Sequence, residues 1–560
     1  MKPITGTVLF IATIALLVFG NTQSLCAQKQ KNSADVIVYG GTSAGIAAAI
    51  QSSRMGKSVI LIESTNRIGG LTTGGLGQTD IGNKVAIGGI SREFYENIRT
   101  YYDNPKNWKW QKKSEYLDGG QTRTEKGENS MWTFEPSAAL NVYKDMISAE
   151  DITLVYNERL NRKNGVKKAS GKILSLQMES GKVFSGSMFI DATYEGDLLA
   201  SAGVTYTYGR ESNDQYGETL NGVQANIKNT SLLGVVSRNG FNHNFVQAVD
   251  PYIRKGNSKS GLLPNLNKTP GLEGSGDKKI QAYCFRMCLT DHPENRIPFV
   301  KPEGYDEKDY ELLFRNYEAG FSGVPWINSS MPNRKTDTNN RNGFSTDFIG
   351  QNYDYPEASY SERERIVAAH RKYQMGLMWT LANHPRIPEK VRKEVSRWGT
   401  AKDEFERPDG WQQQLYIREA RRMISDYVMT QHNCEGLHVP NDPIGLGAYG
   451  MDSHNTQRYV DANGFVQNEG NVECKVKAPY PISYKSIVPK KEECTNLLVP
   501  VCLSATHIAF GSIRMEPVFM VLGQSAATAA SLAIDMGMAI QEIPYRELQK
   551  ELVKDGQRLK

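Results

Sequence analysis

The stretch "ADVIVYGGTSAGIAAAIQSSRMGKSVILIES", residues 34–64, decides the fold of this chain. Val36 to Tyr39 are short, β-branched and apolar, which predicts a buried strand. A glycine-rich turn follows, then an alanine-rich stretch that predicts a helix over 46–54. Residues 58–62 predict a second buried strand, which ends at Glu63. Together these segments form one βαβ unit of about 30 residues, so we expect an α/β fold with a Rossmann-type domain.

The residue types of this unit fit a bound dinucleotide. Gly40 and Gly41 permit the tight turn, and Gly45 lets the helix approach the sheet. The carboxylate of Glu63 can accept hydrogen bonds from both ribose hydroxyls and would repel a 2′-phosphate. The first helical turn places free N–H groups and the positive end of the helix dipole toward a pyrophosphate, which adds three predicted contacts: Thr42, Ser43 and Ala44.

Thr42 leaves an alternative open, because it stands where the middle glycine of the usual motif belongs. A doubly wound sheet that binds nothing at this turn would tolerate that threonine. The stretch that follows, "RIGGLTTGGLGQTD" at 67–80, favours FAD over a nicotinamide cofactor. A glycine doublet directly after the ribose-binding acid suits a backbone path along the pyrophosphate and ribityl chain. The predicted contacts from this stretch are Ser64, Arg67, Gly69, Gly70 and Leu71.

Two later segments are expected to complete the cofactor site. A helix over 133–150 and a meander of short strands lead to a buried strand that ends near Ala192 and Thr193, which could return the chain to the cofactor edge. Alternatively, Asp191 and Asp197 only cap turns there. Residues 516–537 predict a long helix with a small-residue face around Gly523. Its N-terminus, at Glu516, could face the flavin, or the helix could be a core helix without a cofactor role.

The N-terminus has the layout of a secretory signal peptide: Lys2, an apolar run from Val8 to Phe19, and a cleavage position after Ala27. The run is shorter than the roughly 20 residues that a spanning helix needs. Leu25 disfavours lipid attachment at Cys26. We therefore expect an exported, periplasmic protein without an integral membrane span.

Charge and cysteine content exclude several partners. The net charge is only +5 and the sequence contains no run of basic residues, so nucleic-acid binding has no support. The seven cysteines include no CxxC pair, so we predict neither an iron–sulfur cluster nor another metal site.

Several motifs together resemble one family. "GGTSAGIAAA", "RIGGLTTGGLGQTD", "FIDATYEGDLLASAGV" and "NLLVPVCLSATHIAFGSIRMEPVFMVLGQSAATAA" look like the bacterial FAD-dependent oxidoreductases. Many members are exported by glycan-degrading bacteria, and some are labelled xanthan lyase. The resemblance implies a glutathione-reductase-like FAD domain, formed by 34–204 and 485–545, with an inserted α+β substrate domain at 205–484. It also implies FAD contacts at Gly40, Gly41, Gly45, Glu63, Gly69 and Gly70.

The inserted part offers candidate substrate contacts. Residues 279–290 predict a strand, and 361–382 and 411–430 predict helices. The polar stretch 333–347 between them predicts a loop over the cofactor cleft, suited to a polyhydroxylated ligand or simply solvated. The candidate substrate-binding residues are Trp326, Lys335, Asp337, Asn339 and Asn340.

Oxidation of an alcohol requires a base, and histidine suits that role near neutral pH. His454, in "GMDSHN", and His507, in "SATH", are the candidates, although structural hydrogen bonding fits each equally well. Arg418, in "YIREARRM", could anchor a carboxylate or sugar hydroxyls, or pair with nearby acids. Arg514 could place positive charge near the flavin.

We therefore expect an exported FAD-dependent oxidoreductase that transfers a hydride from a small polar substrate, a sugar, to the flavin, with an unidentified electron acceptor. Two alternatives stay open. One is an FAD-containing lyase or isomerase that acts on glycans. The other is a non-catalytic glycan-binding protein with a flavin-type fold, which Thr42 leaves open.

Overall fold

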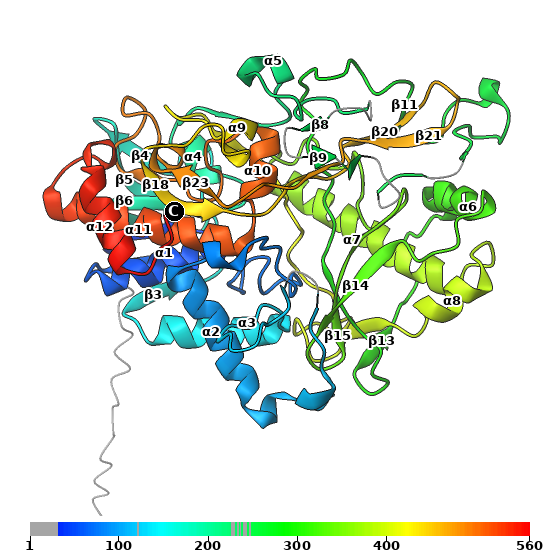
Figure 1. The fold of residues 1–560 in the computed structure, drawn as a ribbon, viewed down its shortest axis with the longest axis horizontal. Coiled ribbons are helices and arrows are strands. Elements are labelled where there is room, and N and C mark those ends of the chain that lie inside the picture. The colour runs from blue at the N-terminus through cyan, green and yellow to red at the C-terminus, as the bar shows by residue number, and fades with distance from the viewer. Residues whose placement is uncertain are drawn as a thin grey trace, which may run out of the picture.

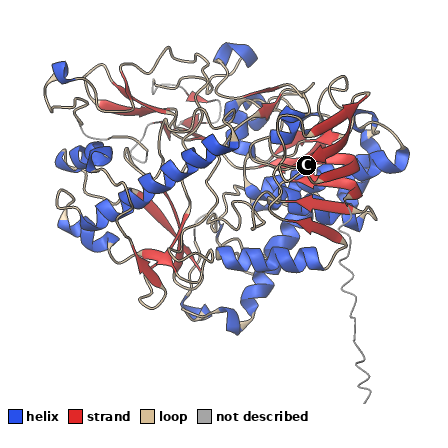
Figure 2. Cartoon of the chain, turned by 180° about the vertical axis from the view of Figure 1, so that it is seen from behind, coloured by secondary structure: helices blue, strands red, loops and turns tan. Residues whose placement is uncertain are grey.

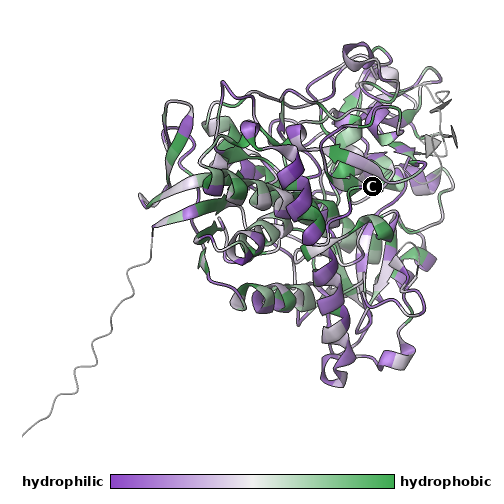
Figure 3. Ribbon diagram, turned by 60° about the vertical axis from the view of Figure 1, so that its left-hand side comes forward, coloured by the Kyte–Doolittle hydropathy of each residue, from purple (hydrophilic) through white to green (hydrophobic). Residues whose placement is uncertain are grey.

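The computed structural model describes residues 32–119, 122–225, 243–245 and 248–560, and short strands at 230–231, 234–235 and 237–238. The predicted signal segment 1–27, with Cys26, lies outside these residues. Within them, one helix, α11 (Glu516–Met536), is long and apolar enough to cross a membrane, but 89% of its apolar window is buried inside the protein. Burial to that extent is typical of a core helix. In Figure 3 the hydrophobic segments lie mostly inside the molecule.

A seven-stranded sheet carries the N-terminal βαβ unit. Its order is β3-β2-β1-β6-β5-β4, with β24 beside β6. The parallel strands are β1 (Ser33–Tyr39), β2 (Val59–Ile62), β3 (Ile152–Val155), β6 (Val183–Asp191) and β24 (Leu497–Leu498). The antiparallel strands are β4 (Val166–Ala169) and β5 (Lys172–Gln177). Figure 2 shows this sheet beside the helices that cover it. The predicted α/β, Rossmann-type fold is confirmed.

Two helices from opposite ends of the chain lie side by side next to this sheet (Figure 1). They are α1 (Ser43–Arg54) and α11. A Cβ added to Gly523 would lie 2.2 Å from the carbonyl oxygen of Ala44, so the small-residue face of α11 sets the distance between the two helices. Other helices of this domain are α2 (Gly89–Asp103), α3 (Pro136–Ser148), α4 (Asp197–Ser201), α10 (His507–Ile513) and α12 (Tyr545–Lys554).

A five-stranded antiparallel sheet forms the centre of the inserted part. Its order is β13-β16-β12-β15-β14. The strands are β12 (Met287–Thr290), β13 (Arg296–Pro298), β14 (Trp326–Met331), β15 (Lys335–Asn340) and β16 (Gly399–Ala401). The long helix α7 (Tyr360–Asn383) runs diagonally across this part in Figure 1. Its other helices are α5 (Asn213–Tyr216), α6 (Glu311–Glu318), α8 (Glu389–Val395) and α9 (Gln431–Cys434).

The described part of the chain also contains several small sheets. Among them, β19 (Met451–Ser453) pairs with β22 (Val472–Cys474), which also pairs with β10 (Ser237–Arg238). The remaining short strands are β7 (Tyr206–Thr207), β8 (Thr230–Ser231), β9 (Gly234–Val235), β11 (Leu266–Asn267), β17 (Arg422–Met423), β18 (Pro443–Gly447), β20 (Gln457–Val460), β21 (Val466–Glu469) and β23 (Tyr480–Ser483).

Three local predictions are wrong in this part. The polar stretch 333–347 is not a free loop, since its first half is strand β15, paired on both sides with β12 and β14. The predicted helix 411–430 is an extended segment with only the short strand β17. The predicted strand 279–290 is reduced to β12. In the first two cases contacts with distant segments override the local pattern, whereas 279–286 has only an isolated bridge at Cys284.

Candidate active site

The glycine turn after β1 orients Glu63. Gly40 has φ +106°, a conformation that favours glycine. The N–H of Gly41 donates to Oε2 of Glu63 at 2.8 Å, and Oε1 accepts from the N–H of Thr65 at 2.8 Å and from Oγ of Ser64 at 3.3 Å. Burial raises the pKa of Glu63 above its usual range. The carboxylate therefore lies at the tip of β2, directly against the turn.

Thr42 has a role that needs no ligand. Its Oγ1 accepts from the N–H of Gly45 at 3.3 Å as the N-cap of α1, and donates to the carbonyl of Ala192 at 2.7 Å. The side chain is thus turned toward β6. Over the described part of the chain, the buried N–H groups of Ser43 and Ala44 have no acceptor. Two buried, unpaired donors at a helix N-terminus suit an anionic acceptor such as a pyrophosphate.

Glu516 joins the three predicted cofactor segments. Its carboxylate accepts from Oγ of Ser43 at 2.6 Å, Oγ1 of Thr72 at 2.8 Å and the hydroxyl of Tyr194 at 2.8 Å. The Tyr194 hydroxyl in turn accepts from the N–H of Leu71 at 2.9 Å. Burial raises the pKa of Glu516. The N-terminus of α11 therefore meets the N-terminus of α1.

Of the other predicted cofactor residues, the glycines form tight turns, whereas Arg67 and Thr193 bond to neighbouring groups of the protein. Gly69 and Gly70 have φ +94° and +51°, so this turn requires glycine. The Arg67 guanidinium donates to the carbonyl of Thr73 at 3.0 Å and lies over the Phe405 ring. Thr193 donates to Asp191, which also accepts from the N–H of Leu199 at 2.8 Å, so Asp191 caps the turn and α4. The free N–H groups, the glycine turns and Glu63 fit an FAD whose pyrophosphate lies at α1.

The candidate substrate cavity has a volume of about 890 Å³ and lies beside β19 and β22. It brings together three predicted residues, His454, Asn339 and Asn340. Sequence reasoning did not propose a cavity role for Asn83, His243, Tyr449, Asp452, Glu473, Lys475 and Lys477, which line it as well. Five of these residues lie in 449–477, where the pairing of β19 with β22 brings them together, and Asn83 and His243 come from distant segments.

His454 is held by a buried ion pair. Its Nδ1 lies 2.9 Å from Oδ2 of Asp347, whose Oδ1 lies 3.0 Å from an Arg418 Nη2. Burial, followed by the charge of Arg418, lowers the pKa of His454 to about 3. Arg418 and His454 together hold the pKa of Asp347 below its usual range despite its burial. The imidazole is therefore neutral, and its Nδ1–H is assigned as the donor to the ionised Asp347. Arg418 acts through Asp347 and does not line the cavity.

Asp452 lies next to His454 on the cavity wall. Its Oδ2 is 3.9 Å from Nε2 of His454 and 3.8 Å from Nη2 of Arg514. Burial raises the pKa of Asp452 to about 6, although Arg514 opposes the shift. Arg514 also donates to the carbonyl of Asp452 at 3.0 Å and stands two residues before Glu516. Arg514 thus connects Asp452 on the cavity wall to the segment that leads into α11.

The remaining predicted residues lie elsewhere. His507 is buried behind β19 and bonds to Glu419 and Ser453. Lys335 lies in a buried ion cluster with Glu135 and Glu404, at 2.7 Å each. Asp337 pairs with Arg286 at 2.7 Å. Trp326 is buried at the start of β14. The structure does not bring these four side chains into the cavity.

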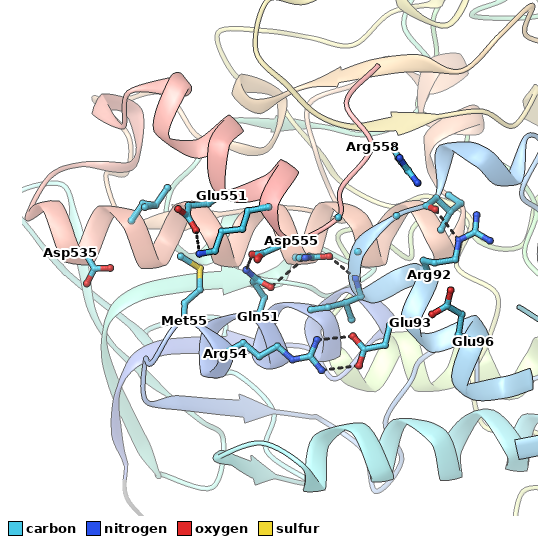
Figure 4. Close-up of a pocket in the computed structure, with 18 residues that line it drawn as sticks. Gln51, Arg54, Met55, Arg92, Glu93, Glu96, Asp535, Glu551, Asp555 and Arg558 are labelled. Carbon is cyan, nitrogen blue, oxygen red and sulfur yellow. Dashed lines mark hydrogen bonds and ion pairs between the residues drawn. The ribbon is translucent and has the colours of Figure 1, made fainter. Parts of the chain in front are cut away.

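A second hollow, of about 690 Å³, lies outside α1, α2 and α12 (Figure 4). Arg54 pairs there with Glu93 at 2.7 Å, and Gln51 donates to Asp555 at 2.6 Å. Because these polar groups satisfy one another, we place the candidate substrate site in the other cavity.

Comparison with solved structures finds distant similarities. One is the OxyS anhydrotetracycline hydroxylase from Streptomyces rimosus, at 11% identity over 32% of this chain and 36% of that one, with a TM-score of 0.23. Another is the L-amino acid deaminase from Proteus vulgaris, at 15% identity over 32% and 53%, with a TM-score of 0.23. A third is the L-proline dehydrogenase from P. horikoshii, at 14% identity over 32% and 59%, with a TM-score of 0.23. The chain thus covers less than two thirds of each of these structures.

Comparison with curated protein sequences finds no match. The model of the FAD dependent oxidoreductase family, in contrast, matches residues 35–552. The protein therefore belongs to the FAD-dependent oxidoreductase family, and FAD is its cofactor.

Proposed function

We propose that this oxidoreductase oxidises a small polyhydroxylated molecule, a sugar or sugar derivative, in the cavity beside β19. The observation that carries the proposal is the convergence of Asp452, His454 and the two amides Asn339 and Asn340 on one cavity. Amide and carboxylate groups supply the donors and acceptors that orient hydroxyl groups. The cavity volume of about 890 Å³ lies in the range typical of small-ligand sites.

FAD, when bound, supplies the acceptor for the hydride. The chain must then take the hydroxyl proton, and Asp452 is better suited to that task than either predicted histidine. A general base works best when its pKa lies near the working pH, and the pKa of Asp452 is raised by burial to about 6. His454, whose pKa is lowered to about 3, stays neutral and presents Nε2 as an acceptor that orients the substrate hydroxyl.

An anaerobic panel of neutral sugars, sugar alcohols and uronic acids tests the proposal. Purified protein should be yellow, and at least one panel member should bleach the flavin absorbance. Product formation without net flavin reduction would instead support the lyase or isomerase alternative. Protein that purifies colourless and takes up no FAD would favour the glycan-binding alternative.

We also infer that the protein is exported to the periplasm, which rests on the layout of residues 1–27. Expression of the full chain in a Gram-negative host tests this inference. The mature protein in the periplasmic fraction should begin at Gln28, as measured by intact mass. Unprocessed protein in the cytoplasm would contradict it.

A further inference from the structure

A line of three buried side chains lies directly behind the cavity wall. Neighbouring residues of a strand point to opposite faces, so Asp452 and Ser453 of β19 face opposite ways. Asp452 lines the cavity, whereas Ser453 is fully buried. Its Oγ lies 2.9 Å from Nε2 of His507, and Nδ1 of His507 lies 2.9 Å from both carboxylate oxygens of Glu419.

The order serine, histidine, glutamate resembles the arrangement of a hydrolase. Here, however, Ser453 and Glu419 are 0% and 1% exposed, and His507 is 2% exposed. No substrate can reach a serine that is sealed in this way, so the line has no nucleophile. We therefore look for its function in the neighbouring residues Asp452 and His454, which line the cavity.

The charge at the far end of the line is fixed. Burial alone would raise the pKa of Glu419, but His507 and Arg422 together lower it to about 2. Glu419 is therefore ionised and accepts from Nδ1–H of His507, while the other ring nitrogen, Nε2, forms the hydrogen bond with the Ser453 hydroxyl. A carboxylate that accepts from one ring nitrogen fixes the orientation of the imidazole, as it does for many metal-bound and catalytic histidines.

Glu419 also reaches the cavity wall by a second route. Its Oε1 accepts from the N–H of Gln281 at 3.0 Å. The side-chain oxygen of Gln281 accepts from the N–H of His454 at 3.1 Å and from Arg514 at 3.2 Å. One buried carboxylate is thus connected both to the Ser453 side chain and, through Gln281, to the backbone N–H of His454.

We propose that Ser453, His507 and Glu419 are positioning residues that hold Asp452 and His454 in place for proton transfer. The proposal rests on the proposed function of the cavity. Displacement of a base by about 1 Å from the productive geometry can slow a reaction up to about 100-fold. Loss of the Ser453 hydroxyl should therefore slow the proton-transfer step without removing any group that touches the substrate.

Ser453→Ala in the FAD-loaded protein is the main test, and Ser486→Ala is its matched control. Ser486 is also fully buried and donates one hydrogen bond, to the carbonyl of Ser483 at 2.6 Å, away from the cavity. We expect Ser453→Ala to reduce the flavin about 10-fold more slowly with the most active panel sugar, at an unchanged KM and with a shifted pH profile. Ser486→Ala should behave as the wild type.

Hydrogen–deuterium exchange without any ligand gives a second readout. Amides of 451–455 should exchange faster in Ser453→Ala and stay unchanged in Ser486→Ala. Wild-type rates and wild-type exchange in Ser453→Ala would overturn the positioning role. If no panel sugar reduces the flavin, the exchange result alone decides whether Ser453 positions residues 451–455.

Asp452→Asn separates this inference from the proposed function. If Asp452→Asn keeps full activity, the proposed function of the cavity fails. If Asp452→Asn loses activity while Ser453→Ala keeps it, only the positioning role fails.

Discussion

Asp452 combines two properties that oppose each other: a position suited to proton transfer and an environment that disfavours its charge. Burial raises its pKa to about 6, and the side chain must be ionised to accept a proton. The rate of flavin reduction should therefore rise with pH through about 6. Stopped-flow reduction between pH 5 and pH 8, with the most active panel sugar, measures this profile. Asp452→Asn should lower the rate at least about 100-fold and remove the step near pH 6; a retained step would show that another group titrates.

The same residue makes a prediction about stability. A carboxyl whose folded pKa is raised binds its proton more tightly in the folded state, so its contribution to stability falls as pH rises from about 4 to about 6. Asp452→Asn should therefore be more stable than the wild type at pH 8, by up to about 3 kcal/mol. That difference should disappear below pH 4. Urea unfolding at both pH values measures it, with the exposed Asp145→Asn as control.

Glu63 should contribute to FAD affinity and not to chemistry. Its carboxylate is fixed by Gly41 and Thr65 at the tip of β2. Hydrogen bonds to a charged group are worth about 1.5–3 kcal/mol, so Glu63→Ala should weaken FAD binding about 10- to 100-fold. Flavin fluorescence released on dilution measures the change. Glu179→Ala, on the exposed surface, should bind FAD as the wild type does; equal affinity in both variants would refute the ribose assignment.

At the scale of elements, the close contact between α1 and α11 depends on the absence of a side chain at Gly523. Helix propensity alone predicts that Gly523→Ala stabilises α11 by about 1 kcal/mol. The added Cβ, however, would lie 2.2 Å from the carbonyl oxygen of Ala44, so the helices must separate. We expect net destabilisation of about 1–3 kcal/mol and weaker FAD retention. Gly119→Ala adds the same group in open space and should change neither, as measured by thermal unfolding and bound-flavin absorbance.

Elements with a strong local pattern could be predicted from the sequence. The βαβ unit, α3, α7 and α11 have clear periodicity or helix-start residues, and each forms where expected. The prediction of a helix over 411–430 was wrong. Arg418, Arg421 and Arg422 each pair with an acid on another segment, which holds the chain extended. Such partners are distant in sequence. No local pattern reveals them.

The candidate site follows the same division. The turn residues around Gly40 and the acid Glu63 belong to one continuous unit, so their spacing was informative. Asp347 lies over 100 residues from His454, and no sequence signal connects them. Burial raises the pKa of Asp452 and lowers that of His454, and the charge of the distant Arg418 lowers the pKa of His454 further. The sequence alone therefore does not reveal the protonation states of Asp452 and His454.

At the scale of the whole molecule, Lys335 connects the five-stranded sheet to helix α3, which comes from an earlier part of the chain. It extends from β15 and pairs with Glu135, at the start of α3, at 2.7 Å, and with Asp403 and Glu404 at 2.9 and 2.7 Å. The ammonium is almost fully buried, and its neighbours raise its pKa well above the usual value despite that burial. Lys335→Met would leave three carboxylates facing one another without a cation.

Removal of one partner from a buried ion cluster costs about 3–5 kcal/mol, because the remaining charges stay desolvated. We expect Lys335→Met to lower the free energy of unfolding by that amount at pH 8. Burial already raises the pKa of Glu135, and loss of the ammonium would raise it further, so the destabilisation should shrink as pH falls toward 4 and the carboxylates take up protons. Lys393→Met is the matched control, because Lys393 pairs with Glu389 at 2.6 Å on the exposed surface of α8, where a pair contributes at most about 1 kcal/mol. Urea unfolding of both variants at two pH values measures the difference, and equal, pH-independent losses would show that the cluster does not hold β15 and α3 together.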